Sequence, residues 1–100
     1  SDGMTNSIGN LLKHLRETRG LLLREVGALL DINPTVLSKI ECGNRFPTRN
    51  QIATLASFYI SHKEEIMTIW LCEKLLFEIK EEEYALPAMH AVMKRLKSLT

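Results

Sequence analysis

The residue types that most often act in catalysis or bind metals are scattered along this chain of 100 residues. Its three histidines, His14, His62 and His90, have no carboxylate or cysteine at the spacing of a metal site. The sequence has no glycine-rich phosphate loop, no pattern of paired carboxylates for general acid–base catalysis and no nucleophile with a nearby base. We therefore expect no enzyme activity, no cofactor and no metal site.

Polar side chains of another kind gather in one short stretch with clear ends. Asn33 can accept a hydrogen bond from the free N–H groups of a new helix, and Pro34 suits the first helical position. Gly43 can take the left-handed conformation that closes a helix. These signals predict a helix over residues 34–42.

This predicted helix is too short to be stable alone, so the rest of the chain must hold it. Its spacing gives it a narrow apolar side and a polar side that is free for hydrogen bonding. The apolar residues are Val36, Leu37 and Ile40, and the polar residues are Thr35, Ser38 and Lys39.

The other expected elements are also helices, because apolar residues recur at i, i+3, i+4 and i+7 and no strand pattern occurs. Gly27 stands on a buried stripe, which indicates that another backbone passes close by, and Asp31 stands where the chain must reverse. The sequence thus predicts an all-α fold with five further helices over about residues 7–18, 22–30, 49–59, 63–79 and 84–99.

The helix over residues 63–79 is apolar around most of its girth, which indicates burial on more than one side. In so small a chain, one of those sides can face a second copy. We expect a domain over residues 7–67 and a C-terminal helical extension over residues 68–100 that forms a homodimer. The residues expected at the dimer interface are Ile69, Trp70, Leu76 and Phe77.

Composition places the chain among ordinary folded domains, with 45% apolar and 25% charged residues. The formal net charge of +1 does not by itself indicate nucleic acid, and the basic excess in residues 1–60 is small. Cys42 and Cys72 could form at most one disulfide bond, and we favour two free thiols in a reducing cytoplasm.

With these elements in place, residues 8–67 resemble the Xre/Cro/CI family of bacterial and phage DNA-binding regulators. The resemblance implies a five-helix, lambda-repressor-like helix-turn-helix domain. The most specific piece is the run Leu37-Ser38-Lys39-Ile40-Glu41-Cys42-Gly43-Asn44-Arg45-Phe46-Pro47, taken together with Arg16 upstream.

The resemblance implies that the helix over residues 34–42 lies in the DNA major groove. Threonine can bond a base or touch a thymine methyl group, and lysine favours guanine O6 and N7, which agrees with such a role. Phosphate contacts would set register and affinity. The expected base-reading residues are Pro34, Thr35, Ser38 and Lys39, and those expected at phosphates are Asn33, Arg24, Asn44 and Arg45.

The resemblance further implies a structural ion pair between Arg16 and Glu41. The chain departs from the family pattern at four positions. A leucine replaces the usual cap of the second helix, another replaces a polar phosphate contact, an aspartate replaces the turn glycine, and a proline replaces a base-reading glutamine. These are Leu22, Leu23, Asp31 and Pro34.

The sequence therefore favours a sequence-specific transcriptional regulator that binds a pseudo-palindromic operator in double-stranded DNA as a homodimer. We expect a cytoplasmic, nucleoid-associated protein of bacterial or phage type. The alternative is an antitoxin or another protein-interaction module of the same fold, with a small protein partner and DNA binding for autoregulation. A toxin-like reading frame beside the gene would favour that alternative.

Overall fold

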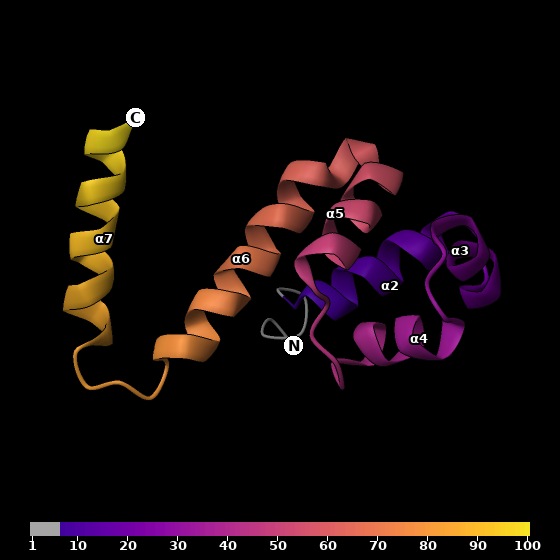
Figure 1. The fold of residues 1–100 in the computed structure, drawn as a ribbon, viewed down its shortest axis with the longest axis horizontal. Coiled ribbons are helices and arrows are strands. Elements are labelled where there is room, and N and C mark those ends of the chain that lie inside the picture. Colours follow the sequence, from indigo (N-terminus) through magenta and orange to yellow (C-terminus); the bar gives the residue numbers. More distant parts are fainter. Residues whose placement is uncertain (1–6) are drawn as a thin grey trace.

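A computed structural model describes residues 7–100 and shows an all-α fold, as the sequence predicts, with no strand among those residues. Figure 1 shows five α-helices packed together and a sixth standing apart. The elements are α2 (Ile8–Thr18), α3 (Leu23–Leu30), α4 (Pro34–Cys42), α5 (Arg49–Phe58), a 3-10 turn (Ile60–His62), α6 (Lys63–Ile79) and α7 (Ala85–Leu99).

Three of these helices begin where a short polar side chain accepts a hydrogen bond from the first turn. The Ser7 hydroxyl accepts from the N–H of Asn10 at 3.0 Å, and Thr48 accepts from the N–H of Gln51 at 3.1 Å. The Asn33 amide oxygen accepts from the N–H of Thr35 at 2.8 Å, so α4 begins at its predicted position. By its residue type Asn6 could also cap the first helix, but it lies outside the described residues.

The core forms around α2, which packs against α4 on one side and α6 on the other (Figure 1). Helix α3 packs on α4, and α5 packs on α6. We call helices α2 to α6 the helical body. Its buried apolar residues are Ile8, Leu12, Leu15, Val26, Ile32, Leu37, Ile40, Ile52, Leu55, Ala56, Tyr59, Ile66 and Trp70.

The turn between α3 and α4 has the left-handed residue and the close approach that the sequence predicts. Asp31 has φ 55° and ψ 44°, and it is the only residue other than glycine with positive φ in residues 7–100. A Cβ on Gly27 would lie 2.6 Å from the Ile32 carbonyl oxygen and 3.1 Å from Pro34 Cγ. Glycine is therefore needed at position 27 because the start of α4 folds back over α3.

A second close approach, at Gly9, was not predicted from the sequence. A Cβ at this position would lie 2.5 Å from the Ile40 carbonyl oxygen and 2.8 Å from that of Glu41. The backbones of α2 and α4 therefore meet with no side chain between them. This contact fixes the C-terminal end of α4 against the first turn of α2.

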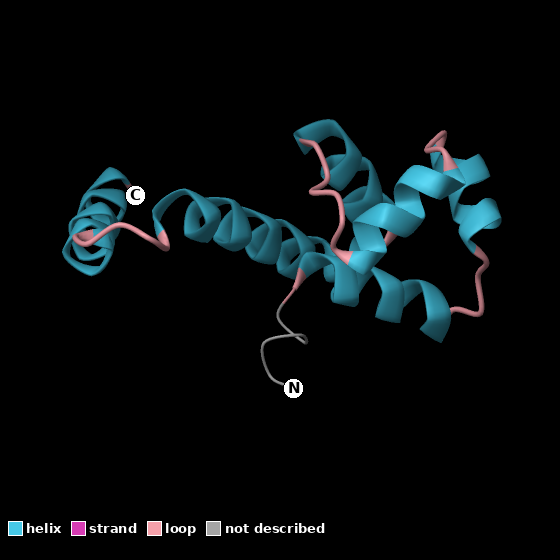
Figure 2. Cartoon of the chain, turned by 90° about the horizontal axis from the view of Figure 1, so that it is seen from below, coloured by secondary structure: helices cyan, strands magenta, loops and turns pink. Residues whose placement is uncertain are grey.

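Helix α6 extends from the core of the helical body toward α7 as one unbroken rod, which Figure 2 shows from below. The predicted boundary between residues 67 and 68 falls inside this rod, and the division of the chain at that point stays a prediction. Helix α7 contains no buried residue and stands away from the helical body in both ribbon views (Figures 1 and 2). None of the helices in residues 7–100 is long and apolar enough to cross a membrane.

Candidate nucleic-acid interface

Helix α4 turns one side into the helical body and leaves the other open. Leu37, Ile40 and Glu41 are buried on the inner side. Thr35 and Lys39 are exposed on the outer side. Of the other two residues expected to read bases, Pro34 is exposed and Ser38 is half-buried at the edge of this side. The four predicted base-reading residues therefore share one surface.

The same outer side includes Cys42, which the sequence analysis did not place there. At 100° per residue, Thr35, Ser38, Lys39 and Cys42 follow the i, i+3, i+4, i+7 pattern of a single helical face. Cys42 is an exposed, free thiol. The spacing alone could have assigned it to this face, so the polar side of α4 extends to the last helical residue.

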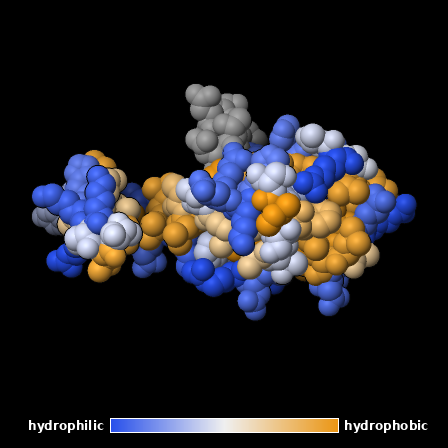
Figure 3. Space-filling view, turned by 90° about the horizontal axis from the view of Figure 1, so that it is seen from above, coloured by the Kyte–Doolittle hydropathy of each residue, from blue (hydrophilic) through white to orange (hydrophobic). Residues whose placement is uncertain are grey.

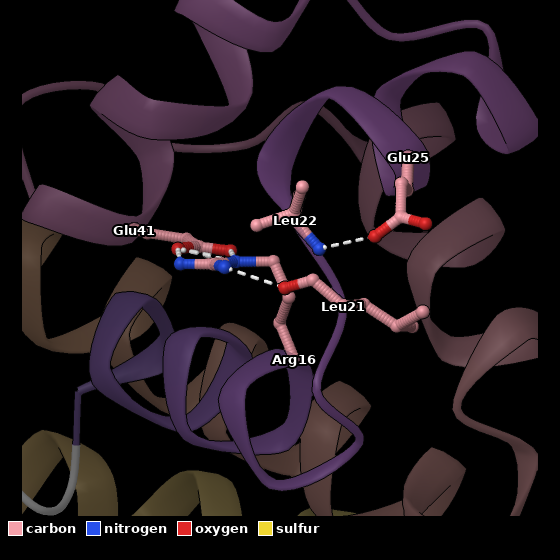
Figure 4. Close-up of polar contacts among 5 residues, drawn as sticks. All are labelled: Arg16, Leu21, Leu22, Glu25 and Glu41. Atoms are coloured by element: carbon pink, nitrogen blue, oxygen red, sulfur yellow. Dashed lines mark hydrogen bonds and ion pairs between the residues drawn. The ribbon is translucent and has the colours of Figure 1, made fainter.

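The buried end of α4 is held by an ion pair with α2, drawn in Figure 4. Arg16 Nε donates to Glu41 Oε2 at 2.9 Å, and Arg16 Nη2 donates to Oε1 at 2.9 Å. A third guanidinium nitrogen, Nη1, donates to the carbonyl oxygen of Leu21 at 2.8 Å. The fork geometry fixes α2, α4 and the start of the α3 segment relative to one another.

This pair is almost closed to solvent, since the side chains of Arg16 and Glu41 are 11% and 4% exposed. The hydrogen bond to Glu41 raises the pKa of Arg16 above its ordinary value, although burial opposes the shift. The guanidinium therefore stays charged, and the role of the pair is to position α4.

The start of α3 offers a less favourable site for phosphate than the resemblance implies. The backbone N–H of Leu22 donates to Glu25 Oε1 at 2.8 Å (Figure 4), so a carboxylate already occupies this end of the helix. An anion at a helix N-terminus is stabilising for the helix but repels a phosphate in the same place. Arg24 is exposed in the same turn and remains available.

The loop after α4 carries Asn44 and Arg45, both exposed. The N–H of Asn44 donates to the carbonyl oxygen of Lys39 at 2.9 Å, and Gly43 adopts φ 84°. These features close α4 with a left-handed residue, as predicted. Both side chains therefore project from a fixed end of the helix.

The rest of that loop is fastened to α6 by Trp70. The indole Nε1 donates to the carbonyl oxygen of Pro47 at 2.9 Å, and the Phe46 ring stacks on the indole with centroids 5.8 Å apart. The guanidinium of Arg49 and the ammonium of Lys74 lie 4.8 and 5.0 Å from the indole centroid. Trp70 thus links α6 to the loop that bears the expected phosphate contacts.

The position of Trp70 affects the prediction that four residues of α6 form a dimer interface. Trp70 is only 2% exposed and belongs to the core, so its side chain has almost no surface left for a partner. Ile69 is half-buried, whereas Leu76 and Phe77 are exposed. The wide apolar girth of α6 therefore consists of two parts. One side includes Trp70 and, further along the helix, the exposed Phe77, and the other is an exposed side that includes Leu76.

A second polar link between α6 and the rest of the helical body was not predicted. Glu73 Oε2 accepts a hydrogen bond from the backbone N–H of Ile8 at 3.1 Å, at the first turn of α2. Burial raises the pKa of Glu73 above its ordinary value, and the bond from Ile8 lowers it by less. An open groove of about 700 Å³ borders this contact, between the α2 start, the loop after α4 and the second half of α6.

Within residues 7–100, no three His, Cys, Asp or Glu side chains come together in a group that could hold a metal ion. Cys42 and Cys72 are both free and exposed. The exposed cations Arg24, Lys39 and Arg45 are the groups that could attract a polyanion near α4.

Comparison with known proteins identifies the type of domain. A family model described as a helix-turn-helix domain matches residues 7–66, more than half of the chain. No curated protein and no solved structure matches the chain. The family match confirms the type of domain expected from the motif and supports DNA as its partner.

Proposed function

Since the chain belongs to the helix-turn-helix domain family, we propose that it is a sequence-specific transcriptional regulator that binds DNA through α4. The observation that carries the proposal is the outer side of α4. It presents Thr35, Ser38 and Lys39 to solvent while Leu37 and Ile40 hold the helix in the core. An α-helix fits the major groove of B-DNA, where each base pair has its own pattern of donors and acceptors.

The proposed assignment of base contacts and phosphate contacts follows from where the side chains lie. Thr35, Ser38 and Lys39 would contact base edges, with Pro34 making only apolar contact because its ring has no donor. Arg24, Asn33, Asn44 and Arg45 flank α4 and would contact phosphates, which set register and affinity. With so few donors on the helix, sequence-dependent DNA shape would supply part of the specificity.

A homodimer completes the proposal, because one short helix reads only a few base pairs. Two helices related by a two-fold axis would read two half-sites about 10 base pairs apart. The exposed apolar residues of α6 and α7 support such an assembly, since large exposed apolar surface commonly marks an interaction site. Figure 3 shows apolar side chains along the narrow part of the molecule, where α6 leads toward α7.

The test is selection of bound sequences from a random DNA pool by the full chain. We expect an enriched motif with two inverted half-sites. A non-palindromic motif would contradict the two-fold homodimer, and a pool with no enriched motif would contradict sequence-specific binding.

The second candidate is a protein-interaction module, such as an antitoxin, in which DNA binding serves autoregulation. The exposed apolar residues of α7 favour it, because the same surface could cover a small protein partner. A small protein that co-purifies at fixed stoichiometry, or a toxin-like reading frame beside the gene, would favour this candidate. A neighbouring DNA methyltransferase gene would favour a controller of restriction and modification.

A further inference from the structure

Two apolar surfaces in the C-terminal part of the chain have no partner within the protomer. The first lies on α6, on the side turned away from Ile66 and Trp70, as the 100° step of the helix requires. Its residues are exposed except for Ile79, which is half-buried. We call this surface the outer face of α6, and it consists of Leu71, Cys72, Leu75, Leu76 and Ile79.

The second surface is one side of α7. Six large apolar side chains lie within an arc of about 140° by the same helical step, and all but Met89 are exposed. A helix of 15 residues is marginally stable alone in water, so this apolar side needs a partner. The residues are Leu86, Met89, Val92, Met93, Leu96 and Leu99.

The two helices are similar in length, and their charges are complementary when they run antiparallel. At 1.5 Å per residue, α6 and α7 are about 26 and 22 Å long. Helix α7 contains Lys94, Arg95 and Lys97 near its C-terminal end and no acidic residue, whereas the first turn of α6 contains Glu64 and Glu65 after Lys63. An antiparallel arrangement brings the basic end of one helix close to the acidic end of the other.

The connection between the helices directs α7 away from its own α6. It is a hydrogen-bonded turn: the N–H of Glu82 donates to the carbonyl oxygen of Ile79 at 2.9 Å, and that of Ala85 donates to Glu82 at 3.2 Å. Figures 1 and 2 show the two helices diverging from this turn. The outer face of α6 is therefore open to α7 of another molecule.

We infer that α7 of each copy packs antiparallel on the outer face of α6 of a second copy, so that the two copies exchange their last helices. Each exchange covers both apolar surfaces, and the two-fold axis makes it reciprocal. This inference rests on the proposed homodimer and names the surfaces that form it.

Cysteine cross-linking tests the exchange, because Cys72 already lies on the outer face of α6. If Leu86 of one copy lies beside Ile79 of the other, position 93 lies beside position 72, one heptad further along both helices. The probe is the full chain with Met93→Cys and Cys42→Ser, oxidised under mild conditions. The control adds Cys72→Ser to these changes.

We expect a covalent dimer whose cross-linked peptides join position 72 to position 93, and loss of that linkage in the control. A disulfide between these positions within a monomer would show that α7 folds back on its own α6 and would overturn the inference. A covalent dimer with only 72–72 or 93–93 linkages would overturn it as well, as would the absence of any linkage.

Sedimentation equilibrium separates this inference from the proposed function. Leu96→Glu places an acid within the exchanged surface, so we expect it to weaken the dimer at least 10-fold. Leu29→Glu, the same change on α3 at a residue that is more exposed than Leu96, should leave the dimer constant unchanged. A dimer that persists in Leu96→Glu overturns the exchange but leaves the DNA-binding homodimer intact. A wild-type chain that stays monomeric contradicts both.

Discussion

The helical body and α7 are both built from amphipathic helices, but they differ in what their apolar sides contact. In the helical body, each helix turns its apolar side into a shared core, and α4 is held there with its polar side outward. Helix α7 has an apolar side of comparable size and buries no residue. The same apolar periodicity can therefore support core packing in the helical body and association with another molecule in α7.

Helix α6 combines a core-facing apolar side with an exposed one. Its inner side supplies Ile66 and Trp70 to the core, and Trp70 fastens the loop after α4. Its outer face is exposed. The outer face includes Leu76, which lines the same groove as Asn44 and Arg45, so a partner bound there could set the spacing of two copies of α4.

The largest expected effect comes from disrupting the buried pair in the helical body. Arg16→Ala leaves the Glu41 carboxylate, 4% exposed, without its partner and removes the donor to the Leu21 carbonyl oxygen. We expect a loss of about 3–5 kcal/mol in the free energy of unfolding, since an unpaired buried charge is costly. Urea unfolding followed by circular dichroism measures it.

The matched change in α7 is Leu96→Ala, which removes an exposed apolar side chain. Measured at a concentration where both proteins are monomers, it should change the free energy of unfolding by less than about 0.5 kcal/mol. Similar losses for Arg16→Ala and Leu96→Ala would remove the distinction between the two regions, because they would mean that α7 belongs to the folded core.

A change in stability smaller than that of Arg16→Ala is expected at Glu73, where α6 meets the start of α2. Burial raises the pKa of Glu73 in the folded state, so the folded chain binds more protons than the unfolded chain above the ordinary carboxyl pKa. Stability should therefore fall as pH rises from the ordinary value through the raised one. Glu73→Gln keeps an acceptor for the Ile8 N–H without the charge, so the variant should be the more stable protein at neutral pH.

The measurement is thermal unfolding of Glu73→Gln and wild type between about pH 4 and pH 7, a range that begins near the ordinary carboxyl pKa, with Glu78→Gln, an exposed position, as the control. The advantage of Glu73→Gln should shrink toward the acid end of this range. An advantage that does not vary with pH would show that the buried charge is not its cause.

Much of the fold could be predicted from the sequence because its signals are local. The cap at Asn33, the proline that follows and the closing Gly43 fixed both ends of α4, and the 3.6-residue spacing fixed the buried sides. Gly27 predicted a close approach because glycine destabilises the middle of a helix and is useful there where another backbone lies against it. The 3-10 turn Ile60–His62 was missed, since it has no comparable local signal.

The contacts that join distant segments could not be predicted in this way. The approach of Gly9 to α4, the bond from Ile8 to Glu73 and the bond from Trp70 to Pro47 depend on how α2, α4 and α6 pack. The Arg16–Glu41 contact was expected only through the family resemblance. Periodicity also could not assign Trp70 to the core side of α6. Apolar residues lie around most of this helix, so their spacing does not show which side faces the core.

The proposal that the outer side of α4 reads DNA can be tested by one binding experiment. It compares Thr35→Ala, Lys39→Ala and Arg45→Ala on the selected DNA sequence and on random DNA, over a range of salt concentrations. The experiment separates base contacts, which depend on sequence, from phosphate contacts, which do not.

We expect Thr35→Ala and Lys39→Ala to weaken binding to the selected sequence by about 1–3 kcal/mol each, with a much smaller loss on random DNA. Arg45→Ala should weaken both to a similar extent and reduce the slope of log K against log salt by about one. Equal losses on the two DNAs for all three variants would contradict the assignment of α4 as the reading helix.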